Sequence, residues 1–204
     1  RRAWSSASIT SRGSGVSGLA GMSGETMREG MAIARPLLEV PRACLVATLR
    51  KAGIDAAQDP SNSDPRFARI RLRQLMPQLE QEGLDAVTLM RLSRRLRRAD
   101  AALAAATRQA ASDIANDHGV LAVPLKAFTQ LSEEVGLRLL GHMIAQAGHE
   151  GPVELGKLEN LDAALRVAIV AAPSGFARTL AGAQVRLTPR FIQVKPAPRR
   201  RTGG

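Results

Sequence analysis

Asp59-Pro60-Ser61-Asn62-Ser63-Asp64-Pro65-Arg66-Phe67-Ala68-Arg69-Ile70-Arg71-Leu72-Arg73 joins a polar turn directly to an arginine-bearing helix. Proline fixes its own backbone, and short polar side chains such as that of Asn62 bond to nearby amides, so the first residues form a turn. Asp64 is a favourable N-cap and Pro65 a favourable first helical residue. The stretch therefore predicts a fixed turn, with Asp59 and Asn62 in structural roles, and a helix that begins at Pro65.

Three arginines of this predicted helix, Arg66, Arg69 and Arg73, lie three and four residues apart and so share one side of it. Guanidinium groups held in fixed places bind phosphate or carboxylate through paired hydrogen bonds. The same pattern also allows an ordinary capped surface helix with solvated arginines. The helix is expected to end at Gly83 and to be kinked at Pro77.

A longer helix is predicted over residues 85–114, where small and apolar residues recur in steps of three and four. Its packing seam consists of Leu89, Leu92, Leu96, Ala99, Leu103, Ala106 and Ala110. Another side carries four arginines, with no acidic residue between Asp85 and Asp100 to neutralise them: Arg91, Arg94, Arg95 and Arg98. This pattern favours a phosphate-binding surface over a solvated face.

The composition also favours a polyanionic partner. The 204 residues carry a net charge of +11 and an isoelectric point of about 11.4, which favours nucleic acid over a membrane surface. Only 2% of the residues are aromatic, which disfavours a base-stacking platform. The sequence lacks an apolar run of spanning length and the apolar core of a signal peptide, so it predicts a cytoplasmic protein.

The predicted fold class is mainly α: a helical, bundle-like linker domain followed by a small α+β C-terminal unit that ends in a β-hairpin. Further helices are expected over residues 41–53, from Ser132 to Gly148 and over 153–171, with a short strand at 120–123. The hairpin is predicted because apolar and polar residues alternate from Ala183 to Leu187 and again from Ile192 to Val194. Residues 188–190 form its turn.

Three glycines near the start, Gly13, Gly15 and Gly18, satisfy the pattern G-x-G-x-x-G, and Glu39 follows at a distance suited to a ribose contact. A dinucleotide site would need a buried strand immediately before the glycines, and residues 4–11 are too polar for one. A local glycine turn, with Gly13 and Gly15 in structural roles, is the preferred interpretation.

The sequence offers little chemistry of its own. The single cysteine, Cys44, lies among apolar residues and is expected to be a buried structural thiol. The three histidines have no metal-ligand spacing, so no metal site is predicted. No nucleophile, histidine and acid stand in an order typical of hydrolases, and no phosphate-binding G-x-x-x-x-G-K-[ST] loop is present.

The opening stretch resembles the DPSN-x-D-x-x-[YF]-x-R-N-x-x-R segment of the tRNA(Ile)-lysidine synthetases. Residues 12–19, RGSGVSGL, resemble the RGSG-x-x-GL turn of that family, and residues 35–38, RPLL, resemble its RPLL segment. The three signals occur in the family's order and at about its spacing. Arg69 and Arg73 match the two motif arginines, whereas Ile70 stands where asparagine is common.

This resemblance implies a definite reaction. ATP adenylates the carbonyl of the wobble cytidine of an isoleucine tRNA, and free lysine then displaces AMP through its side-chain amine, with Mg²⁺ required. It implies that Arg69 and Arg73 contact the tRNA or the activated intermediate, as candidate catalytic residues. Because no S-G-G-x-D-S run is present, we expect the N-terminal PP-loop nucleotide domain to be missing and neither ATP nor Mg²⁺ to bind this chain alone.

The resemblance also implies a domain organisation. Residues 1–11 are expected to be a disordered or non-native lead, and 12–60 a remnant at the rim of the catalytic domain. Residues 61–116 would form a helical tRNA-binding linker, 117–195 a small α+β domain and 196–204 a basic disordered tail. The implied partners are tRNA and free lysine but no membrane, and a homodimer is left open.

Two other classes of protein fit the same sequence. One is a stand-alone, non-catalytic RNA-binding helical module. The other is a structural helical partner protein whose charge serves solubility. Steep salt dependence of tRNA binding would separate the first class from the second.

Overall fold

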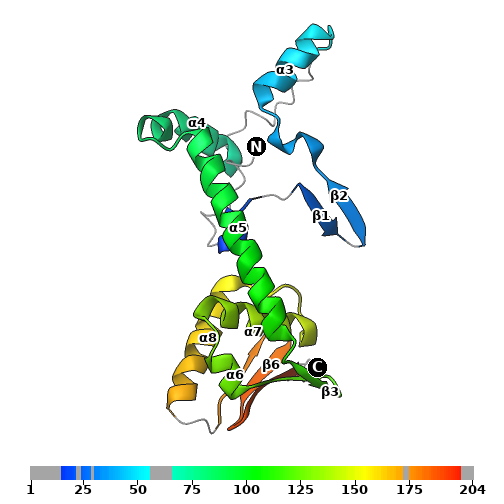
Figure 1. Ribbon diagram of the computed structural model, residues 1–204, viewed down its shortest axis with the longest axis vertical. Coiled ribbons are helices and arrows are strands. Elements are labelled where there is room, and N and C mark those ends of the chain that lie inside the picture. The colour runs from blue at the N-terminus through cyan, green and yellow to red at the C-terminus, as the bar shows by residue number, and fades with distance from the viewer. Residues whose placement is uncertain (1–14, 22–23, 29, 56–65, 172–174, 199–204) are drawn as a thin grey trace, which may run out of the picture. The chain divides into compact units, whose positions relative to one another are not determined.

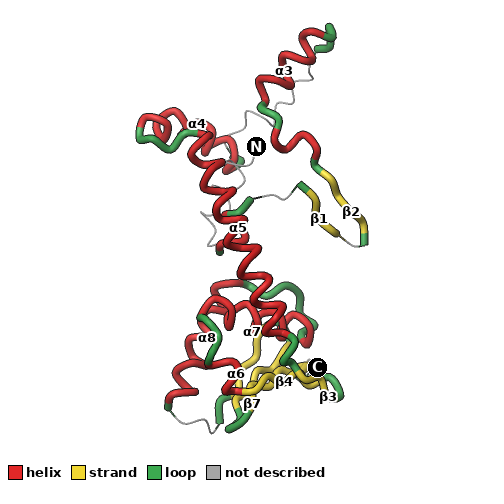
Figure 2. Tube along the Cα trace, viewed as in Figure 1, coloured by secondary structure: helices red, strands yellow, loops and turns green. Residues whose placement is uncertain are grey.

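The structure is a computed structural model of the chain, and it describes residues 15–21, 24–28, 30–55, 66–171 and 175–198 (Figure 1 and Figure 2). Two compact units divide the chain, residues 1–100 and residues 101–204. The predicted turn residues Gly13, Asp59 and Asn62 lie outside the described residues, as do the predicted cap Asp64 and Pro65.

The first unit begins with a short helix, α2 (Val16–Leu19), for which Gly15 is the N-cap. Two strands follow, β1 (Glu25–Arg28) and β2 (Met31–Ala34), and pair as an antiparallel hairpin that the sequence did not predict. Arg35, which follows β2, donates a hydrogen bond from its guanidinium to the Thr26 hydroxyl at 2.9 Å. The RPLL segment is thereby tied back to the hairpin.

A 3-10 helix, η1 (Pro36–Glu39), leads to α3 (Arg42–Lys51), which confirms the helix expected after Pro41. No residue of α3 is buried, and its apolar residues Leu45, Val46 and Leu49 are only half-buried. Cys44 is exposed, so the expectation of a buried structural thiol is wrong. The apolar neighbours of Cys44 in the sequence did not imply that it is buried, because α3 packs little of its surface against the other described residues.

The arginine-bearing helix α4 runs from Ala68 to Gln81. It begins three residues later than predicted, with Phe67 rather than Asp64 at the N-cap position. It contains Pro77 without ending there, and Gly83 follows it with a φ of +82°. That left-handed conformation suits glycine and confirms the predicted stop.

The longest helix, α5 (Ala86–Ala111), confirms the helix expected over 85–114 and is capped by Asp85. The Thr88 amide donates a hydrogen bond to the Asp85 carboxylate at 2.6 Å. Hydrogen bonds from Thr88 lower the pKa of this carboxyl below its ordinary value of 3.8, and the charge of Arg91 acts in the same direction. The ionised form of Asp85 therefore stabilises the start of α5.

Replacing Asp85 with alanine should lower the stability of the first unit at neutral pH. Because the folded-state pKa is depressed, the contribution of Asp85 is present above its unfolded pKa and is lost as the pH falls through the folded value. Urea unfolding followed by circular dichroism, at neutral pH and again well below pH 4, should show the gap between wild type and Asp85→Ala closing on acidification. A gap that stays constant with pH would contradict a role for the ionised cap.

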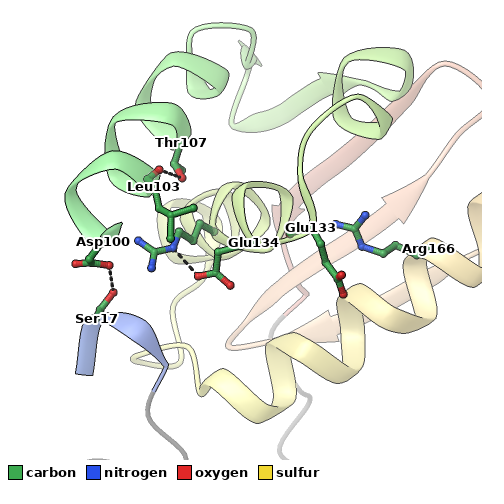
Figure 3. A network of polar contacts seen from close by, with 8 residues as sticks. Ser17, Asp100, Leu103, Thr107, Glu133, Glu134 and Arg166 are labelled. Atoms are coloured by element: carbon green, nitrogen blue, oxygen red, sulfur yellow. Dashed lines mark hydrogen bonds and ion pairs between the residues drawn. The ribbon is translucent and has the colours of Figure 1, made fainter. Parts of the chain in front are cut away.

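The side of α5 that packs in the first unit differs from the predicted seam. Ser93 is buried at 1% exposure, whereas Leu92 is 48% exposed. The Ser93 hydroxyl donates a hydrogen bond to the Ala20 carbonyl at 2.7 Å. The Ser17 hydroxyl donates to the Asp100 carboxylate at 2.6 Å, as Figure 3 shows. Small polar residues let α2 approach α5 closely on this side. A seam defined only by leucine and alanine positions could not reveal this contact.

The second unit is built on a five-stranded antiparallel sheet in the order β3-β4-β7-β6-β5. Its strands are β3 (Ala115–Asp117), β4 (Val120–Pro124), β5 (Ala177–Leu180), β6 (Ala183–Leu187) and β7 (Phe191–Pro196). Alternation decides which face is buried: Leu121 and Val123 of β4 face the core, as do Val185 of β6 and Val194 of β7.

Three helices accompany the sheet: α6 (Leu125–Thr129), α7 (Glu133–Ala147) and α8 (Leu155–Val170). Helix α7 packs against β4, β6 and β7, and α8 packs against β5 and β6. Leu139, Leu140 and Met143 of α7 and Leu165 of α8 are fully buried in this core. The second unit therefore has a continuous hydrophobic core of its own.

One charged pair lies at the junction of α6, α7 and α8. The Arg166 guanidinium binds the Asp162 carboxylate at 2.6 Å and lies over the Phe128 ring at 5.6 Å from its centroid. It also donates to the Glu133 carbonyl at 3.3 Å. A Cβ on Gly136 would come within 2.8 Å of this guanidinium, so Gly136 leaves the room that Arg166 occupies.

Two glycines allow a loop and a turn of the second unit to touch. Gly148 follows α7, and a Cβ placed on it would fall on the carbonyl oxygen of Ala181. Gly182, in the β5–β6 turn, has a φ of +76°, and its Cβ position lies 2.8 Å from the His149 amide nitrogen. The Glu150 amide donates to the Ala181 carbonyl at 3.3 Å. Only glycine at both positions permits this close backbone contact.

The β6–β7 hairpin and strand β4 confirm the predicted strands, and α7 and α8 confirm the predicted helices. Strands β3 and β5 were not predicted. With a sheet in each unit, the chain is α+β rather than mainly α. The C-terminal unit ends in a hairpin, as predicted, but that hairpin is part of a larger sheet.

Candidate nucleic-acid interface

The basic face of α5 consists of Arg91, Arg94, Arg95 and Arg98, and all four side chains are exposed. At 3.6 residues per turn the four fall within about 100° of arc and along roughly 10 Å of helix. Ser93 and Asp100 lie on the opposite side, where they bind Ala20 and Ser17. The contacts with α2 therefore fix which side of α5 the arginines present.

The electrostatics of this face are one-sided. None of the four arginines forms an ion pair with a described residue. Of the acidic residues that bracket them, Asp85 accepts from the Thr88 amide and also interacts electrostatically with Arg91, and Asp100 accepts from the Ser17 hydroxyl. The four arginines therefore share one exposed side of α5, as the sequence predicted, and their role in binding phosphate stays a prediction.

The arginines of α4 form a second group. Arg66 precedes the helix and is exposed, and its carbonyl accepts a hydrogen bond from Arg71 at 2.9 Å. Positions 69 and 73 lie one turn apart within α4, so the backbone places them on one side as predicted. The side chains of Arg69 and Arg73 lie outside the described part of the structure, and their roles stay predictions.

One hollow in the part of the chain that the structure describes is lined by Arg42, Ala43, Val46, Ala47 and Arg50, which all belong to α3. A hollow on one helix cannot surround a substrate. Across residues 15–21, 24–28, 30–55, 66–171 and 175–198, no three His, Cys, Asp or Glu side chains gather into a group that could hold a metal ion.

Within the same described ranges, no helix is both long enough and apolar enough to cross a bilayer.

Comparison with known proteins identifies the relatives of this chain. A family model described as PP-loop domain matches residues 9–79. A protein named tRNA(Ile)-lysidine synthase from Rhodopseudomonas palustris is 50% identical over 199 residues, which cover 94% of this chain and 58% of the relative. The chain is therefore homologous to the tRNA(Ile)-lysidine synthases. The homology extends across both units, since the aligned region is nearly the whole chain.

Two further tRNA(Ile)-lysidine synthases align over the same extent. The protein from Bradyrhizobium diazoefficiens is 45% identical over 212 residues, covering 95% of this chain and 59% of its own length. The protein from Methylobacterium nodulans is 39% identical over 196 residues, covering 94% of this chain and 58% of its own length. The chain thus spans somewhat less than three fifths of these synthases.

The comparison corrects one expectation. We expected the PP-loop nucleotide domain to be missing, and the match of the PP-loop model to residues 9–79 shows that this is wrong. The expectation came from the absent S-G-G-x-D-S run, which is one element of such a domain and does not stand for all of it. The match points to the use of ATP. The finer domain boundaries, such as 12–60 and 61–116, stay predictions.

The sequence missed two features of the interface. Ser17 and Ser93 orient α5, and neither was singled out. Ser17 lies inside the RGSG-x-x-GL segment, so the resemblance offered a signal for it, whereas the buried Ser93 between arginines carried none.

Proposed function

We propose that this chain acts in tRNA modification as part of a cytoplasmic tRNA(Ile)-lysidine synthase. The observation that carries the proposal is 50% identity to the Rhodopseudomonas palustris protein across nearly all of this chain. In the proposed reaction ATP adenylates the carbonyl of the wobble cytidine and releases pyrophosphate. The side-chain amine of free lysine then forms the new C–N bond, and AMP leaves.

The contribution that we assign to this chain is tRNA binding. The basic face of α5 supports it, because four arginines exposed on one side of a helix suit the phosphates of an RNA backbone. Arg69 and Arg73 are proposed to contact the tRNA or the activated nucleotide. The ATP that supplies the adenylyl group and its Mg²⁺ are proposed co-reactants, but the described residues offer no metal-binding cluster, so we assign no step of this chain to Mg²⁺.

A reconstitution experiment tests the proposal. This chain is mixed with the part of the Rhodopseudomonas palustris relative that lies outside the aligned region, together with ATP, labelled lysine and an isoleucine tRNA transcript. Transfer of label to the tRNA that requires both proteins and ATP is expected. Salt-sensitive tRNA binding without transfer would instead favour a non-catalytic RNA-binding module, and salt-insensitive binding would favour a structural role. Light scattering of this chain alone measures its molar mass and so tests whether it forms a homodimer.

Substitution of Arg69 and Arg73 tests the role of α4. The double variant Arg69→Ala/Arg73→Ala should weaken tRNA binding by about 10- to 50-fold at roughly 0.15 M salt, as expected for the loss of two phosphate contacts. Filter binding measures the affinity, and circular dichroism measures the unfolding transition, which should not move. Arg108→Ala, an exposed position of α5 outside its basic face, serves as control. A parallel loss of melting temperature and affinity would mark both arginines as structural.

A further inference from the structure

The helix of the RGSG-x-x-GL segment, α2, is attached to α5 at two points. The Ser93 hydroxyl donates to the Ala20 carbonyl at 2.7 Å, and both residues are buried, at 1% and 3% exposure. The Ser17 hydroxyl donates to the Asp100 carboxylate at 2.6 Å, in a hydrogen bond that is exposed (Figure 3). Two attachments fix both the rotation and the translation of α2 along α5, which one attachment could not do. We call these two hydrogen bonds the α2–α5 clamp.

The α2–α5 clamp lies on the side of α5 opposite its basic face. Ser93 and Asp100 are close to two helical turns apart, so they share one side of α5 and are separated by about 10 Å along its axis. That side is roughly 180° around the helix from the middle of the basic face. A rotation of α2 around α5, or a slip along it, would therefore change where the four arginines lie relative to α2.

The α2–α5 clamp joins two segments with different expected roles. Helix α2 and Ala20 lie within residues 9–79, the match to the PP-loop model that points to the use of ATP. Ser93 and Asp100 lie beyond this match, on the helix whose basic face we propose for tRNA binding. The clamp would then help to set the distance between bound tRNA and the PP-loop region. Reaction rates depend steeply on such placement, since a displacement of about 1 Å can lower a rate by about 10²-fold.

We propose that Ser17, Ser93 and Asp100 are positioning residues for lysine transfer. Through the α2–α5 clamp they hold the PP-loop region and the tRNA on α5 in the geometry that the reaction requires. The inference rests on the proposed function for the reaction itself. It adds that part of the transfer rate depends on side chains of α5 that point away from its basic face, whereas the affinity for tRNA does not depend on them.

The test uses Ser17→Ala and Asp100→Ala, because Ser93→Ala would leave the buried Ala20 carbonyl without its donor and add a folding defect. The full chain is reconstituted with the remaining part of the Rhodopseudomonas palustris relative, and the single-turnover rate of lysine transfer is measured at saturating tRNA and ATP. Each variant should lower this rate by about 5- to 20-fold. Because the four arginines are unchanged, the tRNA affinity from filter binding should stay within about threefold of wild type.

A double-mutant cycle separates the Ser17–Asp100 hydrogen bond from the other contacts of either residue. The double variant Ser17→Ala/Asp100→Ala should be no slower than the slower single variant, because both substitutions remove the same hydrogen bond. The exchanged pair, Ser17→Asp/Asp100→Ser, restores a donor and an acceptor, and its rate should return close to that of wild type. Losses that multiply in the double variant would overturn the inference, as would an exchanged pair as slow as the single variants.

Asp113→Ala is the matched control, because Asp113 is exposed just beyond α5 and its loss changes the net charge as Asp100→Ala does. Its transfer rate should equal that of wild type. If Ser17→Ala and Asp100→Ala also transfer lysine like wild type, the inference is overturned and the proposed function stands. A rate loss that parallels a fall in the urea midpoint, followed by circular dichroism, would mark the pair as structural and overturn the inference too. If wild type itself transfers no lysine, the proposed function fails and the inference fails with it.

Discussion

Replacing Arg91, Arg94, Arg95 and Arg98 together with glutamine should lower tRNA affinity by about 10²- to 10³-fold at roughly 0.15 M salt. The four guanidinium groups are exposed on one side of α5, and the acidic residues that bracket them accept hydrogen bonds from Thr88 and Ser17. Each phosphate contact releases counterions from the RNA, so four lost contacts should also reduce the salt slope by about 3 to 4. Filter binding across salt concentrations measures both quantities.

The control for this variant removes equal charge elsewhere. Arg50, Lys51, Arg108 and Lys126 are exposed and lie outside the basic face, on α3, α5 and α6. Their joint replacement with glutamine should change tRNA affinity by less than about threefold if placement decides binding rather than net charge. Equal losses from the two quadruple variants would show that the chain attracts RNA only through its overall charge, and the assignment of an interface to α5 would fail.

The second large effect concerns folding. Gly148→Ala should destabilise the second unit by about 2–3 kcal/mol, because the new methyl group must displace backbone rather than a flexible side chain. Its Cβ would fall on the Ala181 carbonyl and lie 2.8 Å from the Ile144 carbonyl. Gly148 has a φ of −77°, which alanine adopts without strain, so crowding is the whole cause. Hydrogen exchange of the core amides of Val185 and Val194 reports the free energy of unfolding of this unit.

Gly156→Ala is the matched control, because Gly156 lies in α8 with no atom within 4 Å of its Cβ position. Alanine there should raise the stability of the second unit by about 0.5–1 kcal/mol, through the higher helix propensity of alanine. The two substitutions add the same atoms and should have opposite effects. Destabilisation of similar size in both would mean that the loop at Gly148 rearranges freely and that the close contact with the β5–β6 turn is unimportant.

The sequence predicted the elements whose local pattern agrees with their surroundings. Strand β6 alternates apolar and polar residues because one of its faces is buried, and α7 shows the helical period for the same reason. Strand β5, with the sequence ARTL, is an edge strand that is mostly exposed and has no alternation to detect. Strand β3 is Ala115-Asn116-Asp117, two of whose three residues favour turns, and it pairs because β4 folds back on it. In both cases tertiary contact overrides local preference.

The candidate site could be predicted in part, for a similar reason. Charge without acidic neighbours along α5 is a local property, and the structure places those arginines on one exposed side, as expected. Which side of α5 would be covered depended on Ser93 and Ala20, which are far apart in sequence. Cys44 shows the same limit, since its apolar neighbours suggested burial that no long-range contact provides. The packed side of α5 depends on which distant segment contacts the helix, and a helical period alone does not contain that information.

The order of strands in the second unit has a consequence for synthesis of the chain. Of the five strands of this sheet, β7 (Phe191–Pro196) is the last to leave the ribosome, yet it lies between β4 and β6 and joins them through backbone pairing. Until it emerges, the β3–β4 pair and the β5–β6 pair each expose an unpaired edge, which favours aggregation or capture by chaperones. A nonsense codon near residue 190 would therefore leave nascent chains whose two half-sheets have no strand to connect them.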